Sequence, residues 1–137
     1  HADIQKKGRG QRGKKWISFK GNLFISFFYK INKKFSLREI TFKNCNKIKK
    51  VISNLIEEKL AIKKPNDLLL NKKKICGILQ ETIVFNNELF LIVGVGINLV
   101  KNPTIKNYPT SNIFKETGVK ISKKLLIKGI INEFKFN

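Results

Sequence analysis

The chain has 137 residues, of which 42% are hydrophobic, and a formal net charge of +20. This length suffices for one domain with a buried core, and no apolar run is long enough to span a membrane, so we expect no membrane partner. Cys45, Cys76 and the only histidine, His1, are too few for a zinc site, a disulfide framework or a Cys–His nucleophile.

The first predicted element is a strand at residues 22–30, which are mostly β-branched or aromatic. Ser36 and Glu39 have the spacing of a capping box and predict the start of a helix. Apolar residues at a broken helical period then extend this helix to about residue 59.

Short strands are expected at residues 61–63 and 68–70, on either side of a turn with proline. Residues 75–85 and 89–100 predict a hairpin that turns at Asn86-Asn87. After a loop, a short helix at 111–117 should end at Gly118, and Ser122 should cap a last helix that continues to Phe136-Asn137. Strands in the middle with helices on either side predict an α+β fold with a mixed, mostly antiparallel central sheet flanked by helices.

Residues 8–16 combine three glycines, four cations and the only tryptophan. Glycine allows the close backbone approach of an anion cradle. The spacing Gly8-x-Gly10-x-x-Gly13 also matches a dinucleotide-binding fingerprint, and Gly13-Lys14 nearly matches a P-loop. Both motifs require a helix directly afterwards, whereas a strand follows here, so both interpretations are excluded. A basic surface turn remains as the alternative.

Three further clusters follow in the chain. They are Lys63-Lys64-Pro65-Asn66-Asp67, Lys74-Ile75-Cys76-Gly77-Ile78-Leu79-Gln80-Glu81 and Gly94-Val95-Gly96-Ile97-Asn98. Each has a purely structural alternative: the first could be a tight turn, the second a run of surface lysines and the third a β-bulge.

Together and in this order, the motifs from Gln5 to Asn98 resemble the catalytic domain of a biotin–protein ligase. The resemblance implies the biotin/lipoate ligase fold, which is related to the class II aminoacyl-tRNA synthetase core. It further implies that residues 1–137 are part of this catalytic domain. The N-terminal part of the domain, and any small β-barrel that follows it, would be missing from the chain.

The family is an ATP-dependent ligase that forms biotinyl-5′-AMP and transfers biotin to a lysine of a biotin carboxyl carrier protein, such as a subunit of acetyl-CoA carboxylase. Biotin and ATP are its substrates, Mg²⁺ is required, and a homodimer is compatible with it. By resemblance, Lys74 contacts biotin near its carboxylate, Lys63 contacts phosphate and Asp67 orients the acceptor amine or accepts its proton. These three are the implied catalytic residues, and we expect no metal site built from side chains. The implied biotin- and adenylate-binding residues are Gln5, Gly8, Arg9, Gly10, Gln11, Arg12, Trp16, Asn66, Gly77 and Asn98.

Two positions depart from the family pattern. Gln11 stands where the family commonly has arginine, which should weaken retention of the acyl-adenylate. Lys64 stands where it usually has tryptophan, which suggests a more exposed turn. A lipoate or octanoate ligase on the related fold is the alternative enzyme.

A basic nucleic-acid-binding module is the non-enzymatic alternative. Only three of the 29 cations are arginines, and lysines occur on nearly every predicted element, as expected for drift in an AT-rich gene. We therefore do not expect DNA as a partner of this fragment. Two lone cysteines favour a cytoplasmic location. The chain begins without methionine, which leads us to expect a fragment of a longer protein.

Overall fold

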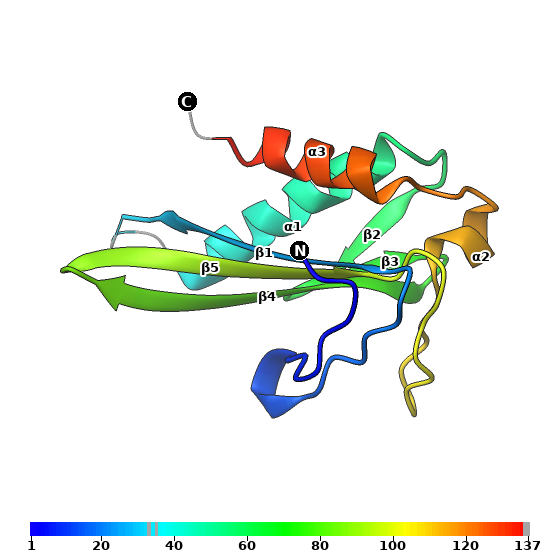
Figure 1. Cartoon of the computed structure of the whole chain (residues 1–137), viewed down its shortest axis with the longest axis horizontal. Coiled ribbons are helices and arrows are strands. Elements are labelled where there is room, and N and C mark those ends of the chain that lie inside the picture. Colours follow the sequence, from blue (N-terminus) through cyan, green and yellow to red (C-terminus); the bar gives the residue numbers. More distant parts are fainter. Residues whose placement is uncertain (33, 35, 136–137) are drawn as a thin grey trace.

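The computed structural model describes residues 1–32, 34 and 36–135. A five-stranded sheet forms its centre, with the strand order β1-β5-β4-β3-β2 (Figure 1). All four strand pairings are antiparallel, so the α+β class is confirmed while the sheet is antiparallel rather than mixed. The strands are β1 (Leu23–Lys30), β2 (Leu60–Lys63), β3 (Asp67–Leu70), β4 (Lys73–Phe85) and β5 (Glu88–Ile97).

Two longer helices, α1 (Leu37–Ser53) and α3 (Lys123–Glu133), lie on one face of the sheet, and the short α2 (Ile113–Thr117) lies at one end of it (Figure 1). The predicted cap of α1 is confirmed, because the Ser36 hydroxyl accepts a hydrogen bond from the Glu39 N–H at 3.1 Å. Ser122 caps α3 in the same way.

Both long helices end earlier than predicted. The helix α1 stops at Ser53 and not near residue 59, because residues 54–59 form the connection that leads back to the sheet at the start of β2. The helix α3 ends at Glu133, and Phe134 then packs against Phe27 of β1 with their ring centroids 4.6 Å apart. Residues 136–137, to which we had extended this helix, lie outside the described residues.

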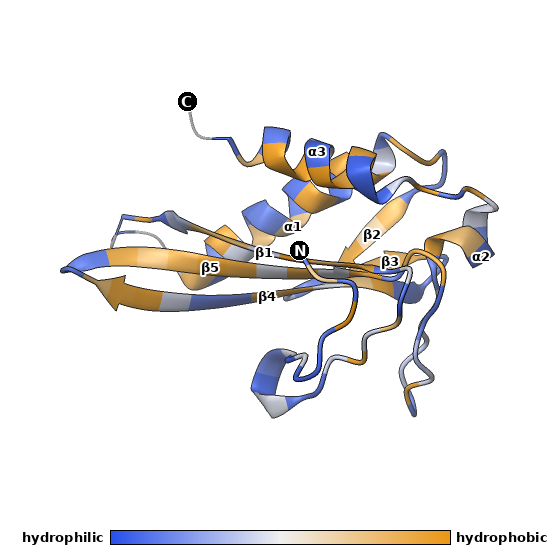
Figure 2. Ribbon diagram, viewed as in Figure 1, coloured by the Kyte–Doolittle hydropathy of each residue, from blue (hydrophilic) through white to orange (hydrophobic). Residues whose placement is uncertain are grey.

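The core lies between the helices and the sheet. The ribbon of β5 is largely hydrophobic in Figure 2. Its alternate residues Leu91, Val93, Val95 and Ile97 are buried in the core, as the two-residue period of a strand requires. Fully burying such a side chain contributes about 1.5–3 kcal/mol. The largest fully buried side chains are Leu23, Ile48, Ile52, Leu68, Leu70, Ile75, Ile78, Leu91, Ile97, Ile113, Leu126 and Ile130.

The predicted β4–β5 hairpin is confirmed, with Asn86 and Asn87 at φ values of 49° and 60° in the turn. The strand β5 ends at Ile97, three residues before the predicted end, because the N–H groups of Leu99 and Val100 donate to the Asn22 side chain instead of a neighbouring strand.

Among the described residues, no long helix lies on the other face of the sheet. Two loops lie there, the N-terminal loop that contains residues 8–16 and the loop that contains residues 101–110 (Figure 1). Within the part of the chain that the structure describes, no helix is both long enough and apolar enough to cross a membrane. This open face, under the two loops, is where the predicted site residues meet.

Candidate active site

Four of the motif residues form one row across the sheet. Lys63 of β2 pairs directly with Asp67 of β3, Asp67 with Gly77 of β4, and Gly77 with Gly96 of β5. Directly paired residues of an antiparallel sheet point to the same face. The sheet register therefore brings a lysine, an aspartate and two glycines from four strands onto one surface.

Lys74 joins this row because of a β-bulge. Between β3 and β4 the register shifts, so that Leu68 pairs with Cys76 and Leu69 pairs with Lys74, which leaves Ile75 as the extra residue. In a regular strand, residues three apart point to opposite faces. Here, a Cβ atom placed on Gly77 would lie 3.3 Å from Lys74 Nζ. The bulge thus turns Lys74 onto the same face as Gly77.

Lys74 and Asp67 form the central ion pair of the site. Lys74 Nζ lies 2.8 Å from Asp67 Oδ1, and the two side chains are 18% and 15% exposed. The other carboxylate oxygen, Oδ2, accepts a hydrogen bond of 2.7 Å from the Tyr108 hydroxyl. Burial, together with this bond to Asp67, raises the pKa of Tyr108, so the phenol stays protonated and donates.

Aromatic rings surround the two predicted catalytic lysines. Lys63 Nζ lies 4.1 Å from the centroid of the Tyr108 ring. Lys74 Nζ lies 5.3 Å from the Trp16 ring and 5.6 Å from the Tyr108 ring. These are cation–π distances, at which the rings stabilise the partly buried ammonium of Lys74 and the exposed ammonium of Lys63.

The Trp16 ring lies against the two paired glycines. A Cβ atom on Gly77 would come within 2.7 Å of the Trp16 ring, and one on Gly96 within 2.6 Å. Only glycine therefore lets the indole approach β4 and β5 so closely. The indole covers Gly77, which the resemblance assigns to ligand binding, and its buried Nε1 has no hydrogen-bond partner among the described residues.

Residues 8–16 form a small hairpin rather than an extended cradle. Gly10 N–H donates to the Lys14 carbonyl at 2.7 Å, and Trp16 N–H donates to the Gly8 carbonyl at 2.9 Å. A Cβ atom on Gly8 would lie 2.5 Å from the Trp16 carbonyl oxygen, so glycine is required there too. A single 3-10 turn, η1 (Gln11–Gly13), closes the hairpin, and β1 follows as predicted.

The hairpin is attached to the sheet by Arg9. Its guanidinium donates two hydrogen bonds to Glu81 of β4, at 2.9 and 2.7 Å. The side chains of Arg9 and Glu81 are 69% and 40% exposed. Gln5, before the hairpin, bonds only through its backbone to Ser18 in the described contacts, and Arg12 is exposed. Of the two arginines of the loop, Arg9 thus binds Glu81 and Arg12 lies on the surface.

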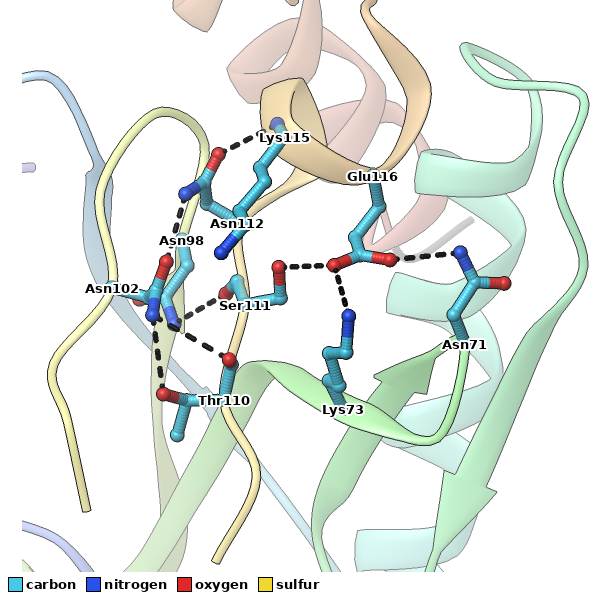
Figure 3. Close-up of polar contacts among 9 residues, drawn as sticks. All are labelled: Asn71, Lys73, Asn98, Asn102, Thr110, Ser111, Asn112, Lys115 and Glu116. Carbon is cyan, nitrogen blue, oxygen red and sulfur yellow. Dashed lines mark hydrogen bonds and ion pairs between the residues drawn. The ribbon is translucent and has the colours of Figure 1, made fainter.

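The two predicted asparagines support the backbone around the site. Asn66 Nδ2 donates to the Ile78 carbonyl at 2.7 Å, and the Ile78 N–H donates to the Asn66 carbonyl at 3.0 Å. Asn98 is 2% exposed, and its Nδ2 donates to the Ser111 carbonyl at 3.1 Å (Figure 3). Their contact with a ligand stays a prediction.

The positions that depart from the family pattern lie on the surface or close to it. Gln11 is half-buried in the turn η1. Lys64 is exposed, as predicted, and its ammonium lies 5.4 Å from the Phe42 ring of α1.

Tyr108 is the residue of this site that sequence reasoning missed. It comes from the loop between β5 and α2, 41 residues after the aspartate that it contacts. The sequence carries little sign of this contact, since Tyr108 stands in a polar loop without a motif.

Comparison with known proteins identifies the fold and its motifs. The family model described as "Biotin/lipoate A/B protein ligase family" matches residues 1–98, which contain all four motifs. The chain belongs to this family. The resemblance inferred from the motifs is thereby confirmed.

Individual relatives agree with this assignment. The chain is 28% identical to the bifunctional ligase/repressor BirA of Escherichia coli, over 98% of the chain and 43% of that protein. It is 31% identical to biotin–protein ligase 2 of Arabidopsis thaliana, over 83% of the chain and 39% of that protein. The solved biotin protein ligase from Aquifex aeolicus in complex with biotin and ATP matches with a TM-score of 0.82 and 26% identity, over 96% of the chain and 56% of the solved chain. The chain therefore spans less than half the length of these curated relatives.

Proposed function

We propose that the protein is an ATP-dependent biotin–protein ligase and that residues 1–137 are part of its catalytic domain. The observation that carries the proposal is Lys74, which is held beside Asp67 and the Gly77–Gly96 pair in a member of this family. The relative from Aquifex aeolicus, which was solved with biotin and ATP, supports the choice of substrates. The acceptor would be a lysine of a biotin carboxyl carrier protein.

In the first step, an oxygen of the biotin carboxylate attacks the α-phosphorus of ATP, and the bond to pyrophosphate breaks. Two anions must approach each other, so fixed positive charge at the reacting atoms lowers the barrier. Lys74 and Lys63 supply that charge from β4 and β2. Gly77 and Gly96 supply a surface without side chains on which a flat ligand can lie once Trp16 moves away.

Mg²⁺ would enter with ATP, because magnesium is commonly held by substrate phosphates and one or two carboxylates. In residues 1–32, 34 and 36–135 there is no group of three or more His, Cys, Asp or Glu side chains that could hold a metal ion. This arrangement fits a metal that is held mainly by the nucleotide. Its contribution would be to offset phosphate charge.

In the second step, the acceptor amine attacks the acyl carbon of biotinyl-5′-AMP, the bond to the phosphate oxygen breaks, and AMP leaves. The amine loses one proton in forming the amide. Asp67 would accept it, and the support for this role is that its carboxylate lies in the site, 2.8 Å from Lys74 Nζ. We assign this role to Asp67. The 8–16 hairpin would shield the reactive anhydride from water.

We also propose a cytoplasmic location. Its support is that Cys45 and Cys76 are both buried free thiols, as proteins in reducing compartments have them. Burial raises the pKa of Cys45 to about 12, so this thiol is not a nucleophile at neutral pH.

The test is an assay of both half-reactions with the full-length protein. Biotin-dependent exchange of labelled pyrophosphate into ATP measures adenylate formation, and label transfer to an isolated carrier domain measures the second step. A parallel series with lipoate or octanoate in place of biotin tests the alternative ligase. We expect pyrophosphate exchange and label transfer with biotin but not with lipoate or octanoate. Activity only with lipoate or octanoate, or no activity of folded protein with any of the three acids, would overturn the proposal.

A further inference from the structure

Tyr108 is held in place by the strand that carries Lys74. The Lys74 N–H donates to the Pro109 carbonyl at 2.9 Å, and the Ser111 N–H donates to the Lys74 carbonyl at 3.0 Å. The loop therefore pairs with β4 in a short parallel bridge at Lys74 and Thr110. Because the loop is in register with the backbone of the lysine, Tyr108 has a defined place next to its side chain.

Side-chain contacts fix the rest of this loop. Asn112 donates to Asn102 at 2.8 Å, and Asn102 donates to the Thr110 hydroxyl at 3.2 Å (Figure 3). Ser111 and Lys73 both contact Glu116 of α2, at 2.5 and 2.9 Å. The loop is thus tied to β4 and α2 directly after Tyr108, and Asn102 ties its earlier part to Thr110 and Asn112, which makes a small displacement of this ring costly.

Three charged groups meet on the Tyr108 side chain. Its hydroxyl donates to Asp67, and the ammonium of Lys63 lies over its ring at 4.1 Å. Lys74 lies between these contacts, 2.8 Å from Asp67 and 5.6 Å from the ring. Lys74 is partly buried and Lys63 is exposed, and their like charges repel each other. The ring and the carboxylate that it orients offset this repulsion.

We infer that Tyr108 is a positioning residue of the adenylation step, an inference that rests on the proposed function. Its hydroxyl fixes the Asp67 carboxylate, and its ring holds Lys63 beside Lys74. When Lys74 turns toward a substrate anion, Asp67 loses a close cation and still keeps the Tyr108 donor. The Asp67 carboxylate then keeps its position and does not pull Lys74 away from the substrate. The ammonium groups of Lys63 and Lys74 therefore stay directed at the same substrate anion.

Two variants separate the roles of the hydroxyl and the ring. Tyr108→Phe removes only the hydroxyl, and Tyr108→Leu removes the aromatic face as well. The chain offers a matched control in its second tyrosine, since Tyr29 bonds to Asn44 of α1 on the helix side of the sheet. Tyr29→Phe therefore removes the same atom outside the site.

The measurement is biotin-dependent pyrophosphate exchange by the full-length protein, with kcat and the KM values for ATP and biotin, and the thermal unfolding midpoint of each variant. Tyr108→Phe should lower kcat by about tenfold or more, because it removes a hydrogen bond to a charged group. Its KM for ATP should stay near the wild-type value, because the ring remains under Lys63. Tyr108→Leu should also raise the KM for ATP by about threefold or more.

Each outcome has one meaning. If the wild type catalyses exchange and both Tyr108→Phe and Tyr29→Phe have wild-type kinetics, the positioning role is overturned and the proposed function stays intact. Equal loss of kcat in Tyr108→Phe and Tyr29→Phe would also overturn it, because the effect would then follow stability and not position. Absence of exchange in the folded wild type would overturn the proposed function itself.

Discussion

Lys74 and Gly77 lie on the same face of β4 although they are three residues apart, because the bulge at Ile75 inserts an extra residue between them. This places the ammonium of Lys74 beside the Gly77–Gly96 surface, which the Trp16 ring covers in this structure. Asp67 and Tyr108 then fix the direction of the charge. The chemistry proposed for the site depends on this one irregularity in an otherwise regular sheet.

Lys74→Ala should lower the rate of adenylate formation by about a hundredfold or more, because it removes a fixed charge aimed at the reacting anions. Biotin-dependent pyrophosphate exchange measures the effect. Lys128→Ala, which removes an exposed lysine from α3, is the matched control and should be neutral. A Lys74→Ala variant that is folded and retains near-normal exchange would remove Lys74 from the mechanism.

Gly77→Ala and Gly96→Ala should displace Trp16, because each added methyl would come within 2.7 or 2.6 Å of the indole. Overpacking of this kind costs about 1–3 kcal/mol in unfolding free energy unless the indole moves away. Gly94→Ala on the same face of β5 is the control, since its nearest neighbour would be 3.7 Å away. The readouts are the unfolding free energy and the emission of Trp16, with Trp16→Phe as the blank. Equal effects at Gly94 and Gly96 would show that the indole does not occupy this place in solution.

Glu81→Ala should release the 8–16 hairpin by removing the partner of Arg9. The pair is exposed, so the loss of global stability should stay below about 1 kcal/mol. Local opening should instead raise the rate of tryptic cleavage after Lys14 and Lys15 several-fold. Glu88→Ala breaks a comparable surface pair with Lys30 at the hairpin end of the sheet and leaves the trypsin sites unchanged. Cleavage at the same rate in Glu81→Ala and Glu88→Ala would contradict the expectation that Glu81 holds the 8–16 hairpin on the sheet.

Glu116 should make stability depend on pH in the acid range. Hydrogen bonds from Ser111, Asn71 and Lys73 lower its pKa from 4.5 to about 2. A carboxyl group whose pKa is lower in the folded state stabilises the fold above its unfolded pKa. This contribution is lost as the pH falls from about 4.5 to about 2.

The measurement is the unfolding free energy across that pH interval, for the wild type and for Glu116→Gln. The variant should be less stable at neutral pH by about 1–3 kcal/mol and should lose less stability on acidification. Parallel curves for the two proteins would contradict the assignment.

The features that the sequence predicted well are those with local causes. The Ser36 cap and the Asn86-Asn87 turn were recognisable because a cap or a two-residue turn is satisfied by atoms within a few positions. The ends of α1 and β5 were less predictable. The strand β5 ends at Ile97 because the Asn22 side chain bonds the following backbone, and these partners lie 77 and 78 residues along the chain. The helix α1 ends at Ser53, with the Asn54 N–H donating back to the Lys50 carbonyl.

The sequence by itself determined the order of the motifs, the α+β class and the family, because the spacing of Gly, Lys, Pro-Asn-Asp and Gly-x-Gly is written along the chain. It also indicated which residues would carry the chemistry. Only the tertiary structure decided how they meet. The Trp16 ring on Gly77 and Gly96 and the bond from Tyr108 to Asp67 join segments that are distant in sequence, and the bulge that turns Lys74 is a register shift between the neighbouring strands β3 and β4. Such contacts follow from strand register and from packing against the whole sheet, which no local pattern encodes.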